Sequence, residues 1–195
     1  MALTYSSMLP LGTKLIPFDL PNTITGQTFS STDVEIEQPT LIMIICNHCP
    51  YVIHYHDELQ RLHKDYSKNL NFIAISSNDV INYPEDSPEK MKELWAKLNF
   101  TFPYLHDETQ EIAKAYQAEC TPEFYLFNAN QILVYRGRCD DTSPGSGKEP
   151  NGKDLRSAIN ALLSGHEIAR EQLPSMGCNI TVSYTHLTLP TTPYV

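Results

Sequence analysis

The chain has 195 residues, 41% of them hydrophobic, and a formal net charge of −9 at pH 7. This length suits one well-packed domain and leaves little for a second. The acidic balance argues against a nucleic-acid surface, and no apolar run approaches the roughly 18 residues of a membrane-spanning helix. Before Lys14 there is neither a positive charge nor a sustained apolar core, so we expect no signal peptide, no membrane contact and a cytoplasmic location.

The N-terminal part predicts short strands ahead of a central buried one. Pro17 to Leu20 predicts a short strand, and Gly26 is placed for a hairpin turn within Thr23 to Phe29. After the break at Gln38-Pro39, the apolar run from Leu41 to Ile45 predicts a buried strand that delivers the sequence CNHCP, with two cysteines spaced C-x-x-C.

A helix and a second strand should follow the cysteines. Apolar residues recur at three- and four-residue steps from Val52 to Tyr66, which predicts an amphipathic helix ending near Lys68. Asn71 to Ser76 predicts the next strand, parallel to the first and joined to it by a right-handed crossover. The stretch from Asn78 to Ser87 predicts a polar loop.

The second half predicts three helices and a hairpin. The expected elements are a helix from Pro88 to about Leu98 capped by Ser87, an extended piece from Phe102 to Leu105, a helix from Glu108 to Tyr116 capped by Asp107, strands Glu123 to Phe127 and Gln131 to Tyr135, a loop from Asp140 to Gly152, and a helix capped by Asp154 through Leu163. This order predicts an α/β protein of thioredoxin-like fold, a central mixed β-sheet flanked by helices, with a peroxiredoxin-type N-terminal β-hairpin and an inserted helix.

The C-x-x-C pair is the predicted reactive group. Two intervening residues in the first turn of a helix hold the sulfurs within disulfide reach, and the helix start stabilises a thiolate. We therefore expect Cys46 to be the nucleophile with a lowered pKa, and Cys49, deeper in the helix, to be the resolving thiol. His48 between them should stabilise the thiolate further; the alternative is an exposed turn residue without a role.

Several segments carry a family resemblance. FDLPNTITGQTF, CNHCPYV, SSNDVINYPEDSPEKMKE, PYLHDETQEIAKAY, CTPEFYLF and LVYRGR resemble the peroxiredoxin-like branch of thioredoxin-fold proteins, the alkyl-hydroperoxide-reductase/thiol-specific-antioxidant domain proteins. The resemblance runs from about Leu15 to Ile180. It implies a cis bond at Thr121-Pro122, with Pro122 shaping the groove where a partner docks beside the cysteines. Thr121, Cys120 and Pro50 are then the expected substrate contacts.

The chain departs from these families at four positions. Thioredoxins usually carry Trp where this chain has Ile45, and often a carboxylate where it has Thr40. When Cys49-Pro50 is aligned with the peroxidatic motif of peroxiredoxins, Cys46 stands in place of the hydroxyl residue and Thr121 about where the arginine belongs. Efficient peroxidase activity is therefore not expected.

The remaining cysteines and the histidines leave alternatives open. Cys120 is either a third exchanging thiol or a packing residue, Cys139 beside two arginines is either structural or activated, and Cys178 on a tail is a candidate for resolving a distant sulfenic acid.

A zinc or copper site is a further hypothesis, with the two C-x-x-C cysteines and His48, His54, His56 and His63 as candidate ligands. His54 and His56 point to different sides of a helix, so we assign no metal ligand.

The sequence predicts a cytosolic thiol–disulfide oxidoreductase that acts on a disulfide substrate, is recharged by an upstream dithiol reductant and requires no bound cofactor. The alternatives are a thiol peroxidase using Cys46 or Cys49, and a non-catalytic metal-binding or chaperone-like module. We divide the chain into an N-terminal extension (1–14), a thioredoxin-like domain (15–165), a C-terminal extension (166–180) and a tail (181–195). The tail has no charged side chain and five threonines, and we interpret it as non-native.

Overall fold

A five-stranded mixed sheet forms the centre of the protein. The computed structural model describes residues 3–35 and 37–181. The strands lie in the order β6-β5-β4-β8-β9. Their bounds are β4 (Thr40–Ile44), β5 (Asn71–Ser76), β6 (Tyr104–His106), β8 (Glu123–Phe127) and β9 (Leu133–Gly137). Strands β4, β5 and β6 are parallel, and β8 and β9 run antiparallel to their neighbours, which confirms the thioredoxin-like fold.

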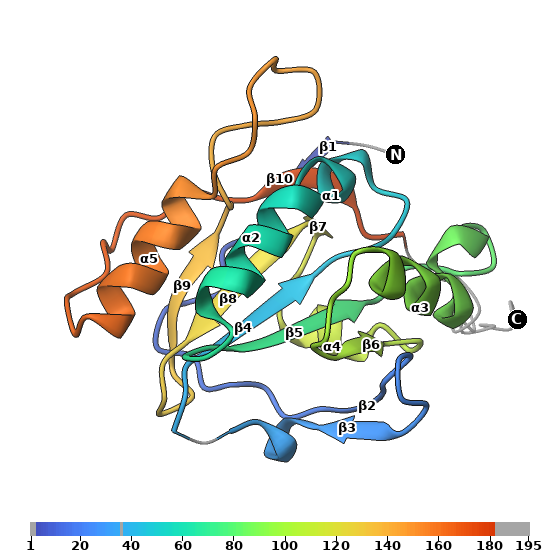
Figure 1. The fold of residues 1–195 in the computed structure, drawn as a ribbon, viewed down its shortest axis with the longest axis horizontal. Coiled ribbons are helices and arrows are strands. Elements are labelled where there is room, and N and C mark those ends of the chain that lie inside the picture. The colour runs from blue at the N-terminus through green and yellow to red at the C-terminus, as the bar shows by residue number, and fades with distance from the viewer. Residues whose placement is uncertain (1–2, 36, 182–195) are drawn as a thin grey trace, which may run out of the picture.

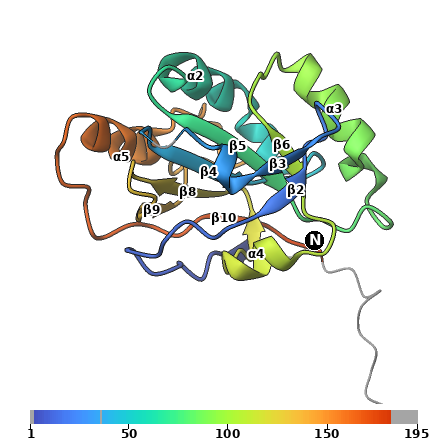
Figure 2. The same ribbon diagram turned by 90° about the horizontal axis from the view of Figure 1, so that it is seen from below.

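Helices cover both faces of this sheet. They are α1 (Pro50–His54), α2 (His56–Tyr66), α3 (Pro88–Lys97), α4 (Glu111–Ala115) and α5 (Lys153–Leu163). Figure 1 shows α2 and α5 in front of the sheet, and Figure 2 shows α2, α3 and α5 above it and α4 below it. Helix α3 is the predicted insertion between the second and third parallel strands. Two 3-10 turns, η1 (Ser31–Asp33) and η2 (Pro84–Asp86), lie in loops.

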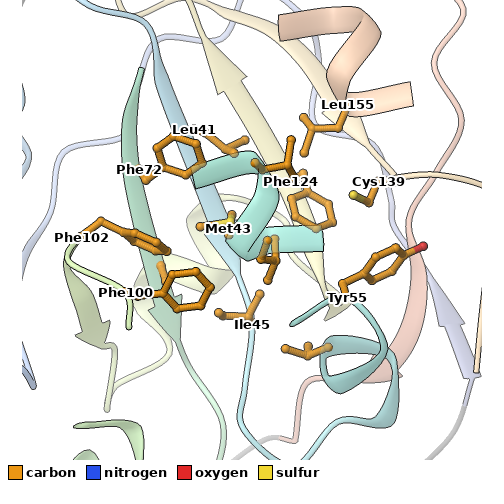
Figure 3. Packing of buried hydrophobic residues seen from close by; sticks show 14 of the residues in the cluster. Leu41, Met43, Ile45, Tyr55, Phe72, Phe100, Phe102, Phe124, Cys139 and Leu155 are labelled. Atoms are coloured by element: carbon orange, nitrogen blue, oxygen red, sulfur yellow. The ribbon is translucent and has the colours of Figure 1, made fainter. Parts of the chain in front are cut away.

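Alternation along β4 divides the core into two layers. Leu41, Met43 and Ile45 belong to a cluster with residues of α1, α2, α3 and α5, as Figure 3 shows for its central members. Ile42 and Ile44 belong to a second cluster, built with the N-terminal segment and the region of α4. All five residues of β4 are buried because the strand has packed layers on both sides. The strand that carries the cysteines to its carboxyl end is therefore rigidly held.

The N-terminal hairpin is confirmed as β2 (Asp19–Pro21) paired with β3 (Thr28–Ser30). The prediction of one continuous helix after the cysteines is wrong, because Tyr55 (φ −92°, ψ 0°) separates α1 from α2. The Tyr55 hydroxyl is held at Asp140 Oδ1, 2.9 Å away, which fixes this break against the loop after β9.

Three further boundaries differ from expectation. Helix α4 starts later than predicted because Gln110 adopts a left-handed conformation with φ 61°, although Asp107 still accepts a hydrogen bond from the helix amide of Ala113. The second hairpin strand starts at Leu133, since Gln131 (φ 59°) belongs to the turn. Asp154 is not a cap: it lies in the first turn of α5 and pairs with Arg138 at 2.6 Å.

Segments close to both ends of the described chain join the domain through a second, small sheet. Strands β1 (Leu3–Tyr5), β10 (Met176–Asn179) and β7 (Cys120–Thr121) lie in the order β1-β10-β7. The tail expected around Cys178 is thus an ordered strand, which pairs with the segment just before Pro122. Of the proposed non-native tail, residues 182–195 lie outside the described part of the chain. None of the helices within residues 3–35 and 37–181 has the length and apolar character needed to cross a bilayer.

Candidate active site

The two cysteines of the C-x-x-C lie just beyond the carboxyl end of β4. Cys46 is 1% exposed and Cys49 is fully buried. The expectation that Cys49 lies inside the helix is wrong. Cys49 is the N-cap residue of α1, because Pro50 is the first residue of that helix. Proline is well suited to that position, where it has no amide hydrogen to leave unpaired. Cys49, rather than Cys46, therefore lies at the positive end of α1.

Thr121 contacts both sulfurs. The Cys46 Sγ lies 3.4 Å from the Thr121 hydroxyl, and the Cys49 thiol donates to the Thr121 carbonyl oxygen over 3.2 Å. The Thr121–Pro122 peptide bond is cis, as the sequence resemblance implied. The structure thus brings together Cys46, Cys49 and Thr121, with Pro122 next in the chain.

The ionisation of the pair is opposite to the expectation. Hydrogen-bond donation to Cys49, burial and the nearby Asp86 carboxylate raise the pKa of Cys46 well above its usual value. Cys49 accepts from the thiols of Cys46 and Cys178 and is stabilised by the hydroxyl of Thr121 and the backbone amide of Val52, which lowers its pKa to about 5 despite burial. Ionisation of Cys49 removes the proton that its thiol donates to the Thr121 carbonyl oxygen, so this hydrogen bond is lost. The hydrogen bonds that the Cys49 thiolate accepts outweigh this loss, so the first negative charge of the pair resides on Cys49.

Asp86 is a site residue that sequence reasoning missed. Its side chain is fully buried in η2, and Oδ1 accepts from the backbone amides of Asn47 (2.7 Å) and His48 (3.2 Å). Oδ2 lies 2.6 Å from His48 Nδ1 and accepts from Asn78 Nδ2 at 3.1 Å. Asp86 therefore fixes the turn between the cysteines. An acidic residue in the loop between Asn78 and Ser87 carried no sequence signal for this role.

His48 is held in one orientation beside the cysteines. The hydrogen bond and charge of Asp86 raise its pKa, and the negative charge of Cys49 adds to this effect. Its ring also stacks on Tyr83, with the ring centroids 4.4 Å apart. His48 is thus not the plain exposed turn residue of the alternative interpretation.

Of the three other cysteines, Cys178 is the one that hydrogen-bonds to the pair, through Cys49. Cys120 is fully buried and its thiol lies 3.8 Å from the buried Glu123 Oε1, and burial raises its pKa far above the usual value. A fully buried thiol directed at Glu123 has the character of a packing residue, so the expected substrate contact at Cys120 is not supported. Cys139 is likewise buried in the core, with a raised pKa, rather than activated by the neighbouring arginines.

The histidines do not converge. His54 bonds Thr142 at 2.9 Å, and His63 packs against Phe72 and Phe102. Within the described residues, the group of side chains with metal-ligating atoms in mutual reach is Cys46, His48 and Asp86, within 4.8 Å of one another. Both Asp86 oxygens already accept hydrogen bonds, so the contacts explain this group as a carboxylate that orients an imidazole.

A cavity of about 180 Å³ borders Pro122. Its lining includes the aromatic residues Tyr5, Tyr55 and Phe124 and the charged residues Arg138 and Asp140. It lies between the small sheet of the chain ends and the loop after β9. A ligand group bound in this cavity would therefore lie beside the cis peptide.

Comparison with known protein families shows the family of this chain. The family model described as the AhpC/TSA family matches residues 11–136. The chain belongs to the AhpC/TSA family. Family membership and the thioredoxin-like fold together support a redox enzyme. No curated protein sequence matches the chain.

Two solved structures are similar over nearly the whole chain. An uncharacterized conserved protein from Geobacillus kaustophilus has 48% sequence identity and a TM-score of 0.91, covering 95% of this chain and 98% of its own. A hypothetical protein from Sinorhizobium meliloti 1021 has 38% identity and a TM-score of 0.89, covering 93% and 99%. A secreted disulfide oxidoreductase of Mycobacterium tuberculosis shares the fold at 16% identity and a TM-score of 0.59, covering 74% and 96%.

Proposed function

We propose that this AhpC/TSA protein is a thiol–disulfide oxidoreductase that acts through Cys46 and Cys49. The observation that carries the proposal is the packing of two thiols against Thr121, beside a cis proline, with the negative charge stabilised on one of them. A thiolate attacks a disulfide, whereas a thiol does not. A buried pair that ionises at one sulfur has the property that disulfide exchange requires.

In the proposed cycle Cys49 is the attacking thiol, which revises the order expected from the sequence. The Cys49 thiolate attacks one sulfur of the substrate disulfide, forms a mixed disulfide and releases the first substrate thiol after protonation. Cys46 then gives up its proton and attacks Cys49, which releases the second substrate thiol and leaves a Cys46–Cys49 disulfide. An upstream dithiol returns two electrons and two protons to the pair.

His48 and Asp86 adjust the charge of this pair. Because the Cys49 charge raises the pKa of His48, a protonated His48 stabilises the Cys49 thiolate by the same interaction. Asp86 raises the pKa of the His48 imidazole and holds the ring in place, but the Asp86 charge opposes ionisation of Cys46. The arrangement therefore favours one thiolate, on Cys49, over two.

Cysteine variants test the proposal. Reduced protein is mixed with dithionitrobenzoate, and the release of its coloured thiol is followed together with the protein mass. We expect the double variant Cys46→Ser, Cys178→Ser to trap a mixed disulfide on Cys49, because no thiol beside Cys49 is left to resolve it. We expect Cys49→Ser to lose rapid reaction. Cys139→Ala, which changes a cysteine buried elsewhere in the core, is the control. Unchanged rapid reaction in Cys49→Ser with loss in Cys46→Ser would restore Cys46 as the nucleophile; unchanged turnover in both would refute the proposal.

A thiol peroxidase is the second candidate, and the position of Cys49 favours it. This residue precedes Pro50 at a helix start and receives a hydrogen bond from Cys46, in place of the hydroxyl that peroxiredoxins use. Cys49 would attack a peroxide oxygen, release water or an alcohol, and become a sulfenic acid that Cys46 condenses to a disulfide with loss of water. Peroxide consumption by the wild type, with a dimedone-reactive sulfenic acid in the double variant Cys46→Ser, Cys178→Ser, would favour this function over disulfide exchange.

A further inference from the structure

We propose that Cys178 is a third exchanging thiol, which attacks Cys49 in the oxidised pair and converts the Cys46–Cys49 disulfide into a Cys49–Cys178 disulfide. The inference rests on the proposed function for its first step, the formation of the Cys46–Cys49 disulfide. It goes beyond that function because it assigns a redox role to the C-terminal strand β10.

Strand register places Cys178 over the pair. Strand β10 runs antiparallel to β7, with Cys178 directly opposite Thr121. Residues directly opposite in an antiparallel pair have side chains on the same face, with Cβ atoms about 5 Å apart. Because the Thr121 hydroxyl lies 3.4 Å from Cys46 Sγ, the Cys178 side chain is on the face that holds the redox cysteines. Cys178 belongs to the same buried cluster as Cys46 and Cys49.

Gly177 allows this close approach. A Cβ atom at Gly177 would lie 1.9 Å from the carbonyl oxygen of Thr121, a distance that no side chain can occupy. Any other residue at this position would push β10 away from Thr121. Glycine thus lets the strand that carries Cys178 lie directly against the site.

Contacts on both sides hold β10 there. Before the strand, the Ser175 hydroxyl donates to the Gly137 carbonyl at 2.7 Å. After it, Ile180 N donates to Glu119 O at 3.0 Å and Thr181 N donates to Asn78 Oδ1 at 3.2 Å. Strand β1 pairs along the outer edge of β10, with Leu3 opposite Cys178. Cys178 is therefore presented to the pair from a fixed strand, and only 7% of the residue is exposed.

The charge on Cys49 decides when Cys178 can react. In the reduced protein, burial and the neighbouring Cys49 raise the pKa of Cys178 to about 12, so it is a thiol that donates to Cys49. When Cys49 enters a disulfide its negative charge is lost, and the part of the shift that this charge causes is lost with it. Cys178 then ionises more easily at the moment when a disulfide is present for it to attack.

The step is an exchange without net oxidation. The Cys178 sulfur forms a bond with the Cys49 sulfur, the Cys46–Cys49 bond breaks, and Cys46 leaves as a thiolate that takes up the proton Cys178 lost. The product holds the same two oxidising equivalents in a bond between α1 and β10. Cys46 is again a free thiol beside the Thr121 hydroxyl.

Disulfide mapping tests the exchange. Full-length protein is oxidised with one equivalent of diamide, quenched in acid, alkylated and digested, and fragment spectra assign each bridge. Cys46 and Cys49 lie on one tryptic peptide, so a bridge to Cys178 gives a cross-linked pair of peptides. We expect a Cys49–Cys178 bridge in the wild type and in Cys46→Ser, and only Cys46–Cys49 in Cys178→Ser.

Two variants control for trivial causes. Gly177→Ala keeps all thiols but displaces β10, and we expect the Cys49–Cys178 bridge to fall by about tenfold while the Cys46–Cys49 bridge persists. Cys139→Ala should leave both bridges unchanged. A wild type with only the Cys46–Cys49 bridge, and a Cys46→Ser protein without any bridge to Cys178, would overturn the inference while leaving the proposed function intact. Absence of the Cys46–Cys49 bridge in Cys178→Ser would instead refute the proposed function.

Discussion

Removal of the hydrogen-bond donor at position 46 should raise the pKa of Cys49. Cys46→Ala removes the donor, whereas Cys46→Ser keeps a hydrogen-bond donor, the serine hydroxyl, on a side chain of similar size. The strongest cause of the lowered Cys49 pKa, about 5, is the hydrogen bond from Cys46. A hydrogen bond to a charged group is worth about 1.5–3 kcal/mol, and one pKa unit corresponds to about 1.4 kcal/mol. Since sulfur is a weak donor, the lower limit applies, and Cys46→Ala should raise the Cys49 pKa by about one unit.

Ultraviolet absorbance of the thiolate, recorded against pH, measures this shift without requiring reagent access to a buried sulfur. The other cysteines do not interfere below neutral pH, because burial raises the pKa values of Cys120, Cys139 and Cys178. We expect both variants to raise the titration midpoint of the Cys49 thiolate above the wild-type value, and Cys46→Ser to raise it less than Cys46→Ala. Cys49→Ala should show no thiolate below neutral pH.

A low-pH thiolate that persists in Cys49→Ala would refute the reasoning, because the charge would then reside on Cys46. Equal midpoints in Cys46→Ala and the wild type would show that the helix start and Cys178, rather than Cys46, stabilise the thiolate.

Three further predictions follow from the buried polar groups. Asp86 raises the pKa of His48, so the stabilisation from the interaction between protonated His48 and Asp86 is complete below about pH 6.5 and is lost as the pH rises through the raised pKa. Asp86→Asn should therefore lower the His48 pKa in NMR titrations and destabilise the protein more at pH 5.5 than at pH 8. Burial raises the pKa of Glu123 to about 7, so the unfolded chain ionises this carboxyl at a lower pH than the folded protein does. The free energy of unfolding of the wild type should therefore fall relative to that of Glu123→Gln between about pH 4.5 and pH 7, by up to about 3 kcal/mol. A difference in urea midpoint between the two proteins that stays constant across this range would contradict this prediction. Tyr55→Phe removes the hydrogen bond to Asp140 and should lower the free energy of unfolding by about 1–2 kcal/mol in urea titrations.

The sequence by itself determined the elements whose pattern is strong and local. The apolar run from Leu41 to Ile45 predicted a buried strand, which the structure has as β4, and Pro88 after Ser87 marked the start of α3. The resemblance around Thr121-Pro122 predicted the cis bond, and the C-x-x-C spacing selected the two cysteines that the structure places against Thr121, because both signals depend on residue identity at fixed spacing. The same local patterns failed at Gln110 and Gln131, where left-handed backbone conformations of non-glycine residues moved element boundaries.

Only the tertiary structure decided which groups meet at the site. Asp86 lies 38 residues from His48 in the chain, and Cys178 pairs with a strand formed by Cys120 and Thr121. No periodicity within a segment reports such contacts, since they depend on how a loop and a chain end fold back over the sheet. The position of the negative charge was decided in the same way. Local spacing favoured Cys46, but the donors that converge from Cys46, Cys178 and α1 stabilise it on Cys49.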